Sequence, residues 1–360
     1  MVLSSNKICD AQSILSREES ASVKGVYILL IVLGHNYIFT HATQSLQIMV
    51  YIYMFHIAGF FMLPYLYGSK EFTLRNIGNN AVRLLWPFFI LAFVFFFGYY
   101  IIIRGHGFRF EDFMRVFVEA DGWTLSVFCG FQVLWFLPSM FLNMIIHDLY
   151  FKYRSIIGPL LILSAVALMI NIINPNVSIF RSVAGIIYSA PWTLWAALLY
   201  GCYGLICREL LIRTRNMTLL VIACGLVAIG VSVLYFTDIP SWGNNMAGDR
   251  WGRVLYPVAF MIPVVVASPK LCKMAWLRWF GENSLLVYLI HPFIGFGIMY
   301  LFPDVYKNPV AIQIIAIVLS LAAILGITVL LVVIIKRCGP LYRFLFPRNI
   351  DQWCEIWQRK

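Results

Sequence analysis

The side chains that could do chemistry in this sequence are few, and they stand inside or beside long apolar stretches. His35 lies in the first apolar stretch, His56 in the second and His291 in the ninth. An imidazole with a pKa near 6.5 can accept or give a proton at neutral pH. Since an ionisable group is costly in apolar surroundings, each of these histidines is a candidate functional residue.

Lys24 and His35 belong to the same apolar stretch and are eleven residues apart. At about 100° and 1.5 Å per residue, both would project from nearly the same face of a helix, about 16 Å apart along its axis. A cation near the membrane surface and an imidazole deeper in would suit the approach of an anionic donor. The alternative is that Lys24 extends its ammonium group to the surface, while His35 hydrogen-bonds a neighbouring helix.

The other candidates have structural alternatives as well. His56 follows several aromatic residues and could be a packed histidine that bonds across a helix bundle. His291 precedes Pro292, which frees a backbone carbonyl that a side chain or water must satisfy. Glu282 is followed by Asn283, and residues of these types commonly cap a helix.

The composition indicates which elements must position these side chains. The 360 residues are 61% hydrophobic, 16% aromatic and 12% charged, whereas soluble domains are about half apolar and about a quarter charged. This excludes a disordered chain, an ordinary soluble enzyme and a disulfide-stapled secreted module. The eight cysteines form no CxxC pair or Cys/His cluster of metal-ligand spacing, so we predict no metal site. The long apolar stretches predict an all-α, polytopic transmembrane helical bundle.

Windows of roughly 20 apolar residues, the length that crosses the hydrocarbon core, predict ten spans. They are 24–41, 45–67, 84–103, 132–150, 156–174, 190–207, 217–236, 252–268, 284–301 and 309–335. The predicted organisation is a cytoplasmic segment over 1–23, a transmembrane domain over 24–335 and a basic, aromatic cytoplasmic tail over 336–360. His147 and Asp148 fall near the inner end of the fourth span, and we expect them at the membrane interface.

The distribution of charge favours this topology. With both termini in the cytoplasm, most of the 27 lysines and arginines fall on the inner side, as the positive-inside rule requires. The net charge of +11 is therefore typical of an inner membrane surface and does not indicate nucleic acid. Of the segments between spans, 104–131 could hold a short amphipathic helix on the outer face. The tail suits a segment that lies on the inner leaflet.

Five blocks of the sequence resemble, in order, the motifs of the acyltransferase family 3 membrane proteins, which include fucose O-acetylase-like enzymes. The blocks are 24–35, 59–63, 83–87, 134–137 and 281–291. The family usually has Arg where this chain has Lys24, a change that keeps the charge but loses bidentate geometry. It often has a second Arg where this chain has Asn80, and usually Ser-Gly where this chain has Pro64 and Tyr65.

The resemblance implies an acyl-CoA-dependent transferase in the inner cell membrane, most often one that moves acetyl from acetyl-CoA to a sugar hydroxyl. The acceptor would be a cell-surface polysaccharide or its lipid-linked precursor. His35 would be the general base, and burial would hold it in the neutral form that a base requires. Lys24 and His291 are the other catalytic candidates.

The resemblance also suggests binding residues. Lys24, Arg75 and Arg83 lie at the inner ends of predicted spans and would contact the CoA phosphates. Glu282 and His56 would contact the acceptor. Beyond acyl-CoA, the glycan and the lipid bilayer, we expect no tightly bound cofactor and no nucleic acid.

A secondary transporter or glycan flippase is the alternative from another class, because ten spans with a polar seam also suit transport. Ion-coupled transporters commonly place acidic residues near the bilayer midplane. No Asp or Glu lies deep in any predicted span, which favours the transferase.

Overall fold

The computed structural model describes residues 13–36, 38–39, 49–67, 72–173, 192–237, 247–301 and 308–358. Within these ranges the chain is helical and contains no strand, which confirms the predicted all-α class. The chain divides into two compact units. Unit 1 comprises 1–16, 61–213 and 345–360, and unit 2 comprises 17–60 and 214–344.

Several helices are long and apolar enough to cross a membrane, so the chain is a helical membrane protein. In the described part of the chain there are four such helical segments: Leu74–Ile103, Gln132–Lys152, Ser284–Leu301 and Val310–Arg337. Shorter apolar helices cover Ile57–Leu66, Arg154–Val166, Met217–Val233 and Leu255–Leu271. All eight overlap predicted spans, although the bounds differ.

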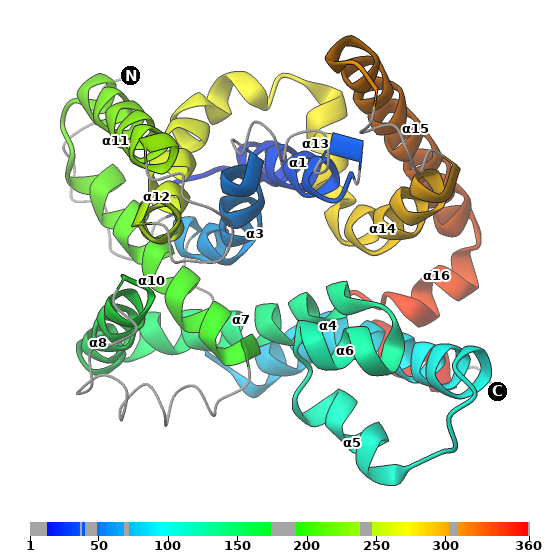
Figure 1. Cartoon of the computed structure of the whole chain (residues 1–360). Helices are drawn as coiled ribbons and strands as arrows, with labels where there is room; N and C mark the ends of the chain where they lie inside the picture. Colours follow the sequence, from blue (N-terminus) through cyan, green and yellow to red (C-terminus); the bar gives the residue numbers. More distant parts are fainter. Residues whose placement is uncertain are drawn as a thin grey trace. The chain divides into compact units, whose positions relative to one another are not determined.

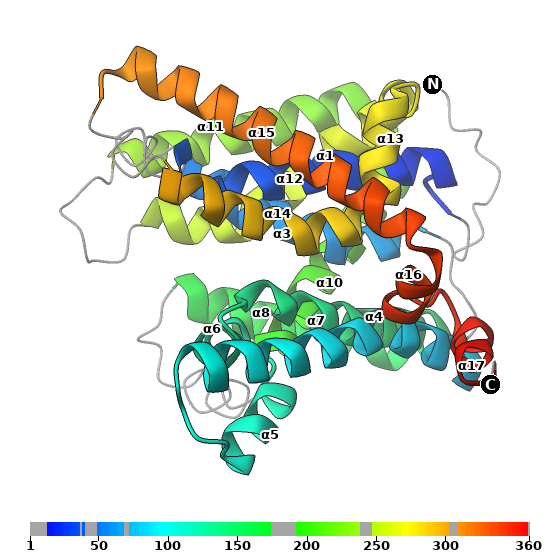
Figure 2. The same cartoon turned by 90° about the vertical axis from the view of Figure 1, so that its right-hand side faces the viewer.

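Unit 1 is built on α4 and α7, which lie side by side (Figures 1 and 2). Its helices are the end of α3 (Met49–Leu66), α4 (Leu74–Phe95) with its π-helical continuation η2 (Phe96–Ile103), α5 (Phe110–Val118), α6 (Gly122–Cys129), η3 (Gln132–Trp135), α7 (Phe136–Lys152), α8 (Arg154–Ile173), α10 (Trp192–Arg213) and α17 (Ile350–Gln358).

Helix α4 begins at Leu74, whereas the predicted third span begins at residue 84. Thr73 has an extended backbone, with φ −127° and ψ 151°, and its side-chain oxygen accepts a 3.2 Å hydrogen bond from the Asn76 N–H. This is an N-cap, and it fixes the start of a helix independently of hydropathy. The apolar window missed the polar first turns, so Arg75 and Arg83 lie within α4 and not in a loop before it.

The segment 104–131 forms two short helices where we predicted one. The amphipathic α5 packs on α4 and η2 through aromatic rings; the ring centroids of Phe113 and Phe96 are 5.3 Å apart. Helix α6 begins at an N-cap, because the Asp121 carboxylate accepts a 2.7 Å hydrogen bond from the Thr124 N–H. Both helices therefore pack on the apolar helices of unit 1.

The end of the tail packs against protein. The ring of Trp353 on α17 lies 5.5 Å from that of Trp86 on α4, and the Asn79 side chain accepts a 3.0 Å hydrogen bond from the Ile350 N–H. We predicted a segment lying on the inner leaflet. The structure shows that α17 packs on α4, and the position of the tail on the inner leaflet stays a prediction.

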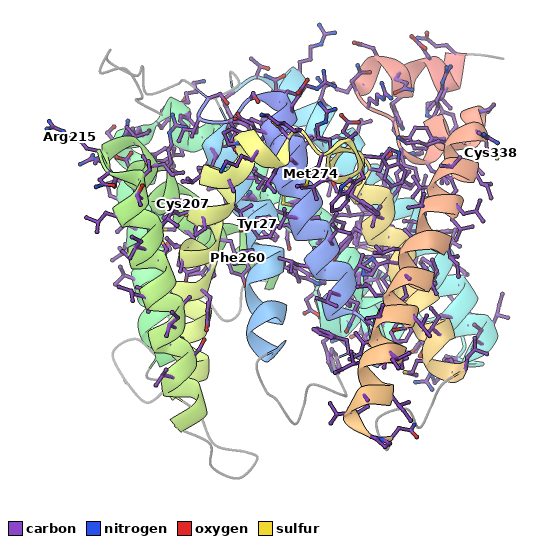
Figure 3. The ribbon with its side chains drawn as sticks, turned by 90° about the horizontal axis from the view of Figure 1, so that it is seen from above. Tyr27, Cys207, Arg215, Phe260, Met274 and Cys338 are labelled. Carbon is purple, nitrogen blue, oxygen red and sulfur yellow. The ribbon has the colours of Figure 1, made fainter. Side chains whose placement is uncertain are left out.

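Unit 2 contains α1 (Arg17–Gly34), α11 (Met217–Thr237), α12 (Ala247–Leu271), α13 (Ala275–Glu282), α14 (Ser284–Leu301), α15 (Val310–Arg337) and α16 (Gly339–Leu345). Helices α11 and α12 lie side by side, as do α14 and α15 (Figure 1). Tyr27 of α1 faces Phe260 of α12 (Figure 3), with the ring centroids 6.0 Å apart.

Helix α1 approaches α13 until the two backbones touch. A Cβ on Gly281 would lie 2.6 Å from the Ala21 carbonyl carbon and 2.9 Å from the Gly25 nitrogen. A Cβ on Gly25 would lie 3.0 Å from the Leu277 carbonyl carbon. Only residues without a side chain permit this separation, so the two glycines set the distance between the helices.

Candidate functional site

Two of the predicted catalytic residues meet in unit 2. His35 lies directly after the end of α1, and His291 lies within α14. Their ring centroids are 5.0 Å apart, with an interplanar angle of 65°. The predicted first span ran to residue 41, whereas α1 ends at Gly34, so His35 stands at a helix end and not inside the helix.

Each of the two rings is held by its own helix. The Nδ1 atom of His35 lies 2.9 Å from the Ile31 carbonyl oxygen, and Nδ1 of His291 lies 2.8 Å from the Val287 carbonyl oxygen. A carbonyl only accepts, so each Nδ1 must carry the hydrogen. In the neutral tautomer assigned this way, the lone pair is on Nε2 of each ring, which is the arrangement that a general base requires.

Pro292 follows His291 within α14. In an α-helix the carbonyl that a proline leaves without a donor belongs to the residue four before it, here Tyr288. The His291 side chain bonds to Val287, one residue earlier. The Val287 carbonyl therefore fixes the orientation of the His291 ring.

The two histidines differ in burial. His291 is buried, and His35 is half-buried. A base must reach the hydroxyl from which it removes a proton. His35 is therefore better exposed than His291 for contact with a substrate.

The residue after His35 contributes a contact that the sequence analysis did not single out. Asn36 donates from Nδ2 to Ser320 Oγ of α15 at 2.8 Å. Its Oδ1 accepts hydrogen bonds from the N–H groups of Ile38 and Phe39, at 3.1 and 3.4 Å. Asn36 could have been recognised from the sequence, because a polar residue beside a histidine in an apolar stretch is unusual. Its contact with Ser320 could not, because the sequence does not show how α15 packs.

Lys24 is half-buried and lies two turns into α1, although the predicted span began there. It precedes Gly25 at the contact with α13. The separation of eleven residues places it about 16 Å from His35 along the helix axis. The two side chains therefore do not form one compact site.

Glu282 is the last residue of α13 and is exposed. We predicted that Glu282 and Asn283 cap the ninth span. Instead Asn283 Nδ2 donates to the Trp279 carbonyl of α13 at 2.7 Å, and only its backbone carbonyl accepts from Val287 of α14, at 3.0 Å. His56 lies on α3, but its side chain is outside the described residues.

The two predicted phosphate contacts of unit 1 are bonded within that unit. Arg75 forms a 2.8 Å ion pair with Asp351 of α17, and both side chains are exposed, at 72% and 62%. Arg83 donates a 3.4 Å hydrogen bond to Asn80 Oδ1. Asn80, which replaces a second arginine of the family pattern, thus bonds to the arginine that remains.

His147 and Asp148, which we predicted near the inner end of the fourth span, are buried inside unit 1. Nδ1 of His147 lies 2.8 Å from Asp148 Oδ1, and the His147 ring packs against Tyr65 and Phe151 at 5.1 and 4.9 Å. Hydropathy could not show this, because burial depends on which helices pack around α7. Among the described residues, no group of three or more His, Cys, Asp or Glu could hold a metal ion.

Comparison with known proteins identifies the family to which the chain belongs. A family model described as an acyltransferase domain matches residues 22–335, most of the chain. No curated protein and no solved structure matches the chain. The match includes most of α1, all of α14 and both members of the histidine pair. The chain belongs to the acyltransferase family 3 of membrane proteins.

Proposed function

We propose that this protein is a membrane-bound O-acyltransferase that transfers an acyl group, most simply acetyl, from acyl-CoA to a hydroxyl group. The acceptor is a cell-surface polysaccharide or its lipid-linked precursor, and the location is the inner cell membrane. Membership of the family supports acyl transfer. The observation that carries the site is the His35–His291 pair, in which both rings are bound through Nδ1.

In the proposed reaction, Nε2 of His35 accepts the proton of the acceptor hydroxyl while the hydroxyl oxygen attacks the thioester carbonyl carbon. The tetrahedral intermediate then collapses, the C–S bond breaks and the ester forms. The His35 imidazolium returns the proton to the departing CoA thiolate. The carbonyl of Ile31, bonded to Nδ1, stabilises the imidazolium between these steps.

His291 is proposed to support His35. It is buried, its own tautomer is fixed by Val287, and its ring stands edge-on to that of His35. A neutral imidazole at this distance restricts the rotation of the His35 ring and excludes water from one side of it. Its role is therefore in catalysis and not in binding the acyl donor.

The binding residues are proposed on the basis of their charge and position. We assign Lys24, Arg75 and Arg83 to the CoA phosphates, and at Arg75 a phosphate would have to replace Asp351. Glu282 and His56 are proposed for the acceptor. Glu282 ends α13, whereas His291 lies seven residues, about 10 Å, beyond the start of α14 at Ser284, so Glu282 would contact a sugar away from the reacting hydroxyl.

The proposed topology has ten spans with both termini in the cytoplasm, and the proposed domains are 1–23, 24–335 and 336–360. Three residues of unit 2 that would lie on the cytoplasmic side are Arg215, Met274 and Cys338. They stand before α11, after α12 and after α15, and all three lie toward the same side of unit 2 (Figure 3). Alternating spans require this arrangement.

The test replaces His35 in a host that produces the glycan. Ester-linked acetyl groups on the purified polymer are measured by NMR for the wild type, His35→Ala and a control, His106→Ala. His106 is an exposed histidine of unit 1. We expect acetylation to be lost with His35→Ala and kept with His106→Ala, while size-exclusion profiles show that both variants fold. Unchanged acetylation in His35→Ala, or a glycan that is no longer exported, would overturn the proposal and favour transport.

A further inference from the structure

We propose that the hydrogen bond between Asn36 and Ser320 positions His35 for proton transfer, so that both are positioning residues of the reaction. The inference rests on the proposed function, because it assigns His35 as the base. It concerns a buried contact between the end of α1 and α15 that lies outside the five motif blocks of the sequence.

The contact is buried and fully bonded. Asn36 and Ser320 are 1% and 5% exposed. Asn36 Nδ2 donates to Ser320 Oγ, and Ser320 Oγ donates to the Ile317 carbonyl of α15 at 3.0 Å. A continuous series of hydrogen bonds thus runs from the α15 backbone to the end of α1. A buried polar group that loses its partner is costly, so this contact resists displacement.

The position of the His35 ring depends on the same end of α1. The Ile31 carbonyl accepts hydrogen bonds from both the His35 N–H, at 3.0 Å, and Nδ1, at 2.9 Å. The Asn36 N–H bonds to the Leu33 carbonyl at 3.0 Å. The last turn of α1 must stay wound for His35 to point as it does, and Asn36 is the residue that anchors this turn to another helix.

A close packing contact fixes the same turn from a second side. A Cβ on Gly295 of α14 would lie 3.2 Å from the His35 carbonyl oxygen and 4.0 Å from Ile324 Cδ1 of α15. The backbone of His35 therefore rests on α14, which also carries His291. With α14 holding the backbone and α15 holding Asn36, a small shift of α15 would change the approach of His35 to its substrate.

Helix α15 also supplies a matched control. Its buried residues form one stripe, Ser320, Ile324, Thr328 and Val332. Thr328 is a second buried hydroxyl, eight residues from Ser320, and its Oγ1 has no hydrogen-bond partner among the described residues. Thr328→Val removes a hydroxyl from the same helix face and leaves the Asn36–Ser320 hydrogen bond in place. It therefore shows whether the loss of any buried hydroxyl on α15 is enough to lower the rate.

The experiment measures steady-state kinetics with acetyl-CoA and, as acceptor, the glycan purified from the His35→Ala strain. We expect Ser320→Ala to lower kcat by roughly tenfold or more, since a misplacement of about 1 Å can cost about 100-fold. The KM for acetyl-CoA should stay unchanged, because the proposed phosphate contacts lie elsewhere. Thr328→Val should keep the wild-type kcat. If Ser320→Ala does not fold, Ser320→Cys keeps the volume and offers only a weak acceptor.

A second comparison tests whether Ser320 acts through His35. In a His35→Ala background, Ser320→Ala should not lower the residual rate further, since groups that act as one unit are not additive. A wild-type kcat for a folded Ser320 variant overturns the inference. It is also overturned if Ser320→Ala lowers the rate of the His35→Ala protein by the same factor as it lowers the rate of the wild type. If His35→Ala itself keeps full activity, the proposed function fails instead.

Discussion

The contact between Gly281 and α1 allows a packing prediction with a magnitude. A Cβ on Gly281 would lie 2.6 Å from the Ala21 carbonyl carbon, whereas ordinary van der Waals contact begins at 3.4 Å. The Ala21 carbonyl oxygen lies closer still, so Gly281→Ala must move the two backbones apart by more than the 0.8 Å between these values. The atoms it meets belong to Ala21 and Gly25 backbone groups, so no side chain can rotate away to relieve the overlap.

The expected cost of Gly281→Ala follows from two opposing terms. Inserting a methyl into a packed contact costs about 1–3 kcal/mol, and more where the neighbours are backbone. Replacing Gly by Ala within a helix returns roughly 1 kcal/mol. We expect a net destabilisation of about 2 kcal/mol. The folded protein should also lose activity, because α14 follows α13 and carries His291, so a shift of α13 displaces His291 from His35.

The assay is the midpoint of thermal unfolding of detergent-solubilised protein, followed by size-exclusion chromatography. Gly326→Ala in α15 is the matched control, because a Cβ there would have no atom within 4 Å. It should leave the midpoint unchanged or raise it slightly. If Gly281→Ala and Gly326→Ala unfold at the same temperature, then the close approach of α1 and α13 is not what stabilises unit 2.

Two further predictions concern the basic residues assigned to the acyl donor. Lys24→Arg should preserve acetyl transfer and Lys24→Met should reduce it, because the assignment uses only the charge; equal rates for all three proteins would show that the charge is not used. Asp351→Asn removes the partner of Arg75. Since the pair is exposed, unfolding should change by less than about 1 kcal/mol, whereas the KM for acetyl-CoA should fall. An unaltered KM would remove Arg75 from the binding residues.

The fold class, the apolar helices and the family could be predicted from the sequence because each depends on local information. Hydropathy over a window identifies a buried helix, and a short motif identifies a relative. The helix ends could not be predicted in this way. Thr73 begins α4 through a side-chain hydrogen bond, and α1 ends before Asn36, so neither boundary follows hydropathy.

The sequence could identify candidate site residues, but it could not show how these residues are arranged in space. His35 and His291 were visible because an ionisable group in an apolar stretch is rare, but that the two rings meet depends on how α14 packs against α1. Ser320 carried no signal, since serines are common in such helices. Asp148 was expected at an interface, and its burial beside His147 depends on the helices that surround α7.

The spacing of two motifs explains how distant parts of the chain form one site. His35 follows Gly25 by ten residues, and His291 follows Gly281 by ten residues. The glycines touch at one end of the contact between α1 and the pair α13 and α14, and the histidines touch at the other. In α1 the ten residues from Gly25 to His35 rise about 15 Å. Gly281 and His291 lie on two successive helices, α13 and α14, so the turn at Asn283 must set the direction of α14 for the imidazoles to meet. The spacing within α1 therefore accounts for only half of the arrangement, and the turn between α13 and α14 accounts for the other half.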